Sequence, residues 1–81
     1  MRWNHRIIKD VCQVTGETYL EIHEVYYNDN GIPNAATKNP ITISGENLTS
    51  LIWTVDKIKE CLGKPILEWD EEKGIYIEVD N

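Results

Sequence analysis

The most regular hydrophobic pattern of the chain lies in its second half. Apolar side chains recur there every three or four positions, at Leu48, Leu51, Ile52, Val55, Ile58 and Leu62. This spacing is typical of an amphipathic helix that packs one face on a core. Asn47 can cap the first turn through its side chain, and Gly63 followed by Pro65 is typical of a helix end. The pattern predicts a helix over 48–62, and its most buried residues should be Leu51, Val55 and Ile58.

Trp53 is the exception within this helix. At about 100° per residue it points almost directly away from the apolar residues. Its helical neighbours are all polar, namely Thr49, Ser50, Asp56, Lys57 and Glu60. Either the C-terminal segment covers it, with Trp69 as a packing partner, or it is exposed and binds another protein. Because tryptophan is enriched at binding hot spots, Trp53 is the first candidate for partner binding.

The remaining hydrophobic segments alternate as strands do. Strands are predicted at residues 3–11, 19–27, 35–44, 66–69 and 75–79. Asn28 to Gly31 separate the second and third of these, and such residues tolerate the backbone of tight turns. Pro40 lacks an N–H, so the third strand should be interrupted there or lie at a sheet edge. The last two strands flank a charged loop and should form a hairpin.

The order of these elements predicts an α+β fold in a single domain over residues 1–81. Residues 3–67 should form its core, and residues 68–81 an acidic C-terminal hairpin or tail. We expect an antiparallel β-β-β-α meander with the one helix on one sheet face, followed by a short β-hairpin or strand.

The second strand presents two different faces. Leu20, Ile22 and Tyr26 share one face, which we expect to meet the helix. The other face carries Tyr19, Glu21, His23, Val25 and Tyr27. This mixed aromatic and polar face suits either ordinary sheet packing or a second binding patch, for which Tyr19, His23 and Tyr27 are the candidates.

Charge adds a further candidate surface. The net charge is −6 and the isoelectric point is about 4.7, so we expect no direct binding of DNA or RNA. The chain begins with basic residues, at Arg2, His5, Arg6 and Lys9, and ends with acidic ones. The acidic end either promotes solubility or faces a basic protein partner. In the second case, the binding residues would be Asp70, Glu71, Glu72 and Glu78.

Several kinds of chemistry lack any motif. His5 and His23 have no serine or cysteine fixed beside them, the glycines are isolated, and no histidine or cysteine spacing indicates a metal site. We therefore expect no enzyme activity, no cofactor and no metal. The chain has neither a transmembrane run nor a signal-peptide pattern, so we expect a cytoplasmic protein that does not bind membranes, with Cys12 and Cys61 as free thiols.

Two resemblances extend this interpretation. The segments IHEVYYNDNGIP, NPITISGENL, TSLIW and GKPIL resemble a widespread family of small uncharacterised proteins from bacteria and mobile elements. That resemblance spans about residues 3–67 and implies no activity. Three strands followed by a Gly-Glu-Asn-Leu helix start are more loosely similar to HicB-type antitoxins, in which Gly-Asp-Thr-Leu is typical. Those proteins mask a small basic RNA-cleaving toxin, and the resemblance implies a masking module without their DNA-binding segment.

The sequence thus supports two functional hypotheses. In the first, an acidic, non-enzymatic protein masks a basic nucleic-acid-processing partner, either a toxin nuclease or a nucleic-acid-guided defence complex met by a phage. In the second, the chain is a self-associating structural or regulatory subunit, and an edge strand or the outer helix face forms a homodimer.

Overall fold

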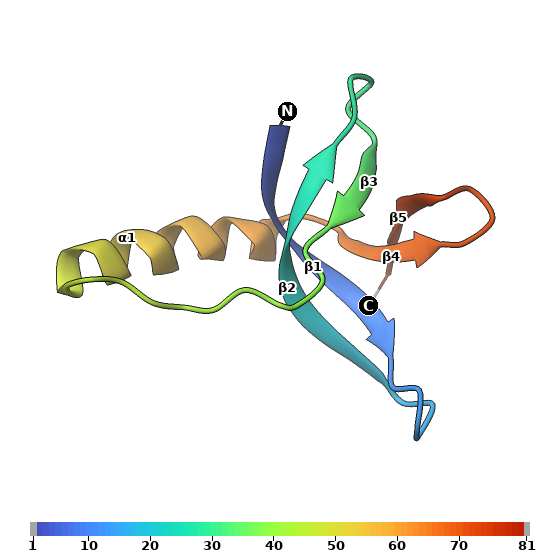
Figure 1. Cartoon of the computed structure of the whole chain (residues 1–81), viewed down its shortest axis with the longest axis horizontal. Coiled ribbons are helices and arrows are strands. Elements are labelled where there is room, and N and C mark those ends of the chain that lie inside the picture. The colour runs from blue at the N-terminus through green and yellow to red at the C-terminus, as the bar shows by residue number, and fades with distance from the viewer. Residues whose placement is uncertain (1, 81) are drawn as a thin grey trace.

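The computed structural model describes residues 2–80, in which five strands form one mixed sheet and a helix extends to one side of it (Figure 1). The strand order is β3-β2-β1-β4-β5. The elements in chain order are β1 (Arg2–Val11), β2 (Thr18–Tyr27), β3 (Pro33–Ala36), α1 (Leu48–Lys59), the 3-10 turn η1 (Glu60–Gly63), β4 (Ile66–Asp70) and β5 (Ile75–Val79). The predicted α+β class is confirmed.

The sheet is not a purely antiparallel meander. β1 and β2 form a long antiparallel hairpin, but β4 pairs with the free edge of β1 in parallel, with Ile8 opposite Leu67. The segment containing α1 returns the chain to that edge in the direction of β1, which is how a crossover connection produces a parallel pair. β5 then pairs with β4 in the predicted hairpin.

The third strand is shorter than predicted. Regular pairing with β2 ends at Ala36, and single hydrogen bonds follow from Thr37 N to Glu24 O (3.0 Å) and from Ile41 N to Ile22 O (3.0 Å). The interruption between them contains Pro40, which has no N–H to donate. The chain therefore follows β2 intermittently before it leaves the sheet.

The core lies on one face of the sheet, which curls so that its outer strands β3 and β5 contact each other. Ile8, Val25 and Leu67 are buried at its centre, and Tyr27, Ala36 and Tyr76 pack against them. The expectation for β2 is therefore wrong, because the face with His23 and Val25 is buried whereas Leu20 is 44% exposed. The sheet covers this face by its own curvature, and no helix is needed there.

The helix forms where predicted, but it does not cover the sheet. α1 and η1 together span residues 48–63, and α1 extends away from the strands beside the chain that leads into it (Figure 1). We call residues 41–63 the arm. Ile58 and Cys61 are buried at its base, whereas Val55, which should have been among the most buried residues, is 38% exposed. The helix is amphipathic as predicted, but few other residues of the protein pack against its apolar face.

Candidate binding surfaces

A row of exposed apolar residues follows the arm. It comprises Leu48, Ile52, Val55 and Leu62, with exposed fractions of 70%, 52%, 38% and 67%. At about 100° per residue these four side chains fall within an arc of roughly 80°. We call this row the apolar stripe. A continuous row of this kind on a helix is more informative than scattered exposed apolar residues, because it matches the way helices dock on proteins.

The start of α1 is fixed by its own residues and by the neighbouring chain. Ser50 N donates to Asn47 Oδ1 (2.9 Å), and Asn47 N donates to Ser50 Oγ (3.2 Å), which forms a capping box. Gly45 lies so close to the first turn that a Cβ there would be 2.6 Å from Leu51 N. The extended part of the arm therefore packs beside Leu51 and leaves the apolar stripe uncovered.

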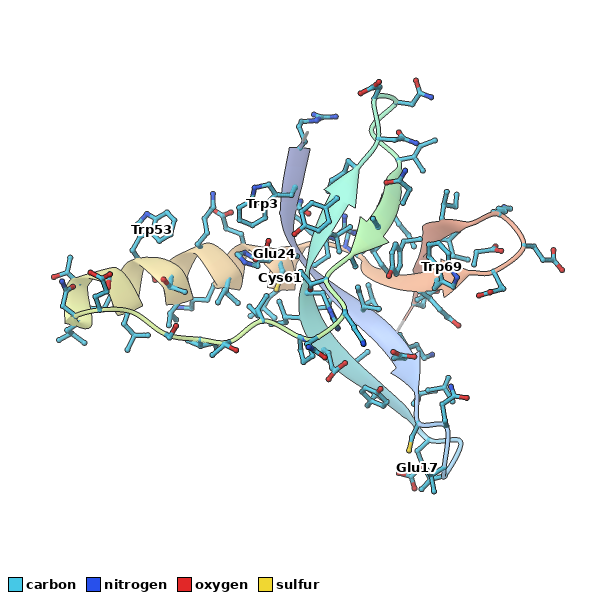
Figure 2. The ribbon with its side chains drawn as sticks, in the orientation of Figure 1. Trp3, Glu17, Glu24, Trp53, Cys61 and Trp69 are labelled. Atoms are coloured by element: carbon cyan, nitrogen blue, oxygen red, sulfur yellow. The ribbon has the colours of Figure 1, made fainter. Side chains whose placement is uncertain are left out.

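Trp53 is 66% exposed. Its ring projects from α1 on the side opposite the extended part of the arm (Figure 2). Trp69 does not cover it: this residue lies on β4, forms an edge-to-face pair with Tyr76 at 4.9 Å, and donates from Nε1 to Glu71 Oε2 (2.8 Å). The arm thus presents two separate exposed surfaces, the apolar stripe and Trp53.

The structure does not bring the three β2 candidates together as an open patch. Tyr19 is 41% exposed, whereas His23 is only 7% exposed. The His23 ring lies 3.0 Å from Thr37 O through Nδ1 and 3.4 Å from Glu21 Oε1 through Nε2. Tyr27 donates from its hydroxyl to Asn4 Oδ1 (2.7 Å). His23 and Tyr27 are therefore engaged within the sheet, and Tyr19 is the accessible member.

The structure separates the four acidic candidates: Asp70, Glu71 and Glu72 lie at the turn between β4 and β5, whereas Glu78 lines a hollow beside Arg6 and Lys64. Asp70 ends β4, and its carboxylate accepts from Lys73 N (3.0 Å), which closes the turn into β5. Glu71 and Glu72 are exposed within that turn, and Glu78 is exposed on β5. The turn is a solvated acidic surface whose geometry depends on Asp70.

An apolar groove of about 400 Å³ lies beside β2, next to the base of the arm. It is lined by Ile7, Leu20, Glu21, Ile22, Pro40, Ile41 and Ile43. Leu20 and Ile43 are 44% and 57% exposed. The chain passes from this groove through residues 44–47, which are exposed, to the first residue of the stripe, Leu48, so groove and stripe are two separate apolar surfaces.

A second hollow, of about 680 Å³, opens near the start of β1 between the edges of the curled sheet, and we call it the basic cleft. Its charged residues are Arg2, Arg6, Lys64 and Glu78, and its aromatic residues are Trp3, Tyr27 and Tyr76. Sequence reasoning noted Arg2 and Arg6 only as part of a basic N-terminus. A signal was present in the spacing. Residues two apart in a strand share a face, so Arg2 and Arg6 lie on the same face of β1 as the apolar residue Ile8. Lys64 comes close to Arg2 and Arg6 only because of the crossover connection, so the spacing of residues along the sequence could not predict its position in the cleft.

No group of three or more potential metal ligands occurs among residues 2–80, and none of the helices in that range is long and apolar enough to cross a membrane. Comparisons with protein families, with curated proteins and with solved structures found no match. The two resemblances noted from the sequence therefore stay predictions.

Proposed function

We propose that this chain is a non-enzymatic, self-associating subunit, and that the apolar stripe of the arm packs against a second copy. The exposure of the stripe carries this proposal. Full burial of an exposed aliphatic side chain contributes about 1.5–3 kcal/mol, and these four side chains would contribute the part of it that matches their exposed fractions of 38–70%, before the costs of association. The exposed apolar residues of the strands, such as Trp3, Leu20 and Trp69, lie on different strands. The stripe instead gathers four of them on one helical face, so the arm is the region with most to gain from a second copy.

The dimensions of the molecule support an occupant as large as another protomer. Its accessible surface is 6103 Å², about 1,100 Å² more than the ~5,000 Å² expected for a compact monomer of 9.4 kDa. A typical protein interface covers about 800 Å² on each partner. The Cα radius of gyration is 13.7 Å, compared with about 12 Å for a compact chain of this length. The excess surface is thus of the size that a dimer would remove.

The apolar groove offers a site for the partner's stripe. A two-fold symmetric dimer requires each copy to present the same pair of complementary surfaces. This chain presents an apolar helix face and an apolar groove that includes Leu20 and Ile43, both exposed. Two copies could therefore exchange arms, each stripe entering the other's groove.

The test compares two glutamate substitutions on the same helix. Ile52→Glu places a charge in the stripe, whereas Thr49→Glu adds the same charge at an exposed position outside it. Sedimentation equilibrium from about 1 to 100 μM, the range in which typical subunit contacts form, should show a dimer for the wild type and Thr49→Glu. Ile52→Glu should be monomeric with an unchanged sheet spectrum. A wild type that is monomeric throughout, or equal effects of both variants, would contradict the proposal.

The masking hypothesis is supported by a separate observation, the exposure of Trp53 away from the stripe. That face stays free in a dimer and could anchor a basic partner, while the acidic turn accelerates encounter. Once a candidate partner is available, surface plasmon resonance should show faster dissociation for Trp53→Ala, by about tenfold or more for a hot spot. Glu71→Gln with Glu72→Gln should instead slow association and reduce its salt dependence. If Trp53→Ala leaves dissociation unchanged, Trp53 is not the anchor.

A further inference from the structure

The basic cleft has the opposite charge to the rest of the molecule. The chain carries a net charge of −6, yet three of the four charged residues around this cleft are cations. They come from separate parts of the fold: Arg2 and Arg6 from β1, and Lys64 from the segment that joins η1 to β4. Cations that converge from distant positions in an acidic protein indicate a site for an anion.

Arg6 is the central feature of this cleft, because it is buried without a counter-charge. It is only 8% exposed. Nη1 donates to Tyr27 Oη (3.0 Å) and Nη2 donates to Pro65 O (2.7 Å), whereas Nε has no acceptor among residues 2–80. Neither ion pair within that range includes Arg6.

The neighbouring groups do not neutralise this guanidinium. Both of its hydrogen-bond acceptors are uncharged. The Cys61 thiol is near enough to feel the charge of Arg6, but burial raises the pKa of Cys61, so the thiol keeps its proton. Glu78 lines the cleft without forming an ion pair to Arg6 within 4.0 Å. A buried, unpaired cation is costly to a small protein, and an anion bound in the cleft would remove that cost.

We propose that the basic cleft binds a small dianion, with Arg6 as the buried anchor and Arg2 and Lys64 as cations at the rim. The ligand class is a compact phosphate monoester or dicarboxylate. Arginine recognises both through paired N–H donors, and two of its five N–H groups are already used here. The cleft volume of about 680 Å³ lies within the usual range for small-molecule sites, about 300–1,000 Å³. This site is separate from the apolar stripe, so it does not depend on self-association.

The experiment measures binding of inorganic phosphate and of succinate by two-dimensional NMR titration and by thermal shift. Sodium chloride at matched ionic strength is the reference. We expect saturable binding with shifts confined to residues around the cleft, together with a rise in melting temperature that chloride does not produce. Stronger binding of phosphate would assign the site to phosphate monoesters, and stronger binding of succinate would assign it to dicarboxylates.

Three variants locate the site. Arg6→Gln should abolish saturable binding. Lys64→Gln, at an exposed position, should weaken binding about tenfold, as expected for the loss of one charged contact. Lys38→Gln removes a lysine that does not line the cleft and should change nothing. If Arg6→Gln does not fold, the difference in anion binding between Lys64→Gln and Lys38→Gln is enough to test the site.

Two outcomes of the binding experiments would overturn the proposal. One is a response to phosphate and succinate no larger than the response to chloride. The other is an equal loss of binding in Lys64→Gln and Lys38→Gln, which would indicate general attraction of anions. A further readout separates a binding role of Arg6 from a structural one. Without ligand, Arg6→Gln should melt no lower than the wild type, because it removes an unpaired buried charge. A lower melting temperature with anion binding retained would show that Arg6 only supports the sheet.

Discussion

The curled sheet and the arm both carry a regular hydrophobic pattern, yet their apolar side chains differ in how far they are buried. In the sheet, Val25 and Leu67 are 0% and 1% exposed. In the arm, Val55 and Leu62 are 38% and 67% exposed. The two pairs match in residue type and differ in surroundings. Strand curvature brings the two sheet edges together over Val25, whereas no other segment of residues 2–80 closes over the stripe.

This contrast shows that an amphipathic pattern specifies a face and not its partner. The spacing of apolar residues in the sequence predicts correctly which residues share one side of α1. Whether that side meets the sheet or a second molecule depends on where the connections at Gly45 and Gly63 direct the helix. The matched pairs of residues make the comparison testable.

The largest effect should come from placing a charge in each region. Val25→Asp buries an unpaired carboxylate at a fully enclosed position, at a cost of several kcal/mol, about 3 or more, against a total stability of about 5–15 kcal/mol. We expect the variant not to fold, so that circular dichroism shows no cooperative unfolding transition. Val55→Asp should leave the sheet folded and remove self-association. A Val55→Asp protein that unfolds as completely as Val25→Asp would mean that the arm belongs to the monomer core.

Truncation of matched leucines should give a smaller difference. Leu67→Ala removes a buried side chain and should lower the free energy of unfolding by about 2–5 kcal/mol. Leu62→Ala, at a largely exposed position, should change it by about 0.5 kcal/mol or less when measured on the monomer. Urea denaturation at low protein concentration measures both. Similar losses for the two variants would contradict the difference in packing.

Removal of the helix cap should act on the arm alone. Asn47→Ala deletes the acceptor for Ser50 N and should destabilise α1 by about 1 kcal/mol. Because α1 packs on little of the sheet, hydrogen exchange should accelerate in the helix amides and stay unchanged in β1 and β2. Asn39→Ala, at an exposed position outside the helix, is the control. Equal acceleration throughout the sheet would show that helix and sheet unfold as one unit.

The smallest effect concerns alkaline pH at the base of the arm. Burial raises the pKa of the Cys61 thiol, so the folded state holds this proton more tightly than the unfolded chain does. The resulting stability is fully present below the unfolded pKa of about 8.5 and is lost as the pH rises through the folded pKa. Cys61→Ala should therefore flatten the decline of stability above that pH.

Cys12→Ala is the matched control for this pH profile. Hydrogen bonds with Thr15 lower the pKa of the Cys12 thiol, so rising pH does not weaken the folded state at that site. The control variant should keep the decline that Cys61→Ala reduces. A decline that persists unchanged in Cys61→Ala would assign it to other groups, such as Tyr76, whose pKa burial also raises.

Local patterns predicted most of the elements. Alternation defined β1 and β2, Asn47 and Gly63 marked the two ends of the helical segment, and Pro40 marked the interruption of the chain beside β2. Of the candidate site, the sequence identified the stripe and separated Trp53 from it. These predictions succeeded because capping, proline geometry and side-chain periodicity act within a few residues.

The long-range features were decided only by the tertiary structure. The parallel pairing of β4 with β1, the burial of the His23 face and the convergence of Arg6 with Lys64 depend on the path of the crossover. The sequence alone placed apolar residues on one side of α1 and cations near the start of the chain. The direction of the arm left the first set exposed, and the curvature of the sheet enclosed Arg6 in the second. Contacts between distant residues depend on connections and curvature, which the spacing of neighbouring residues does not encode.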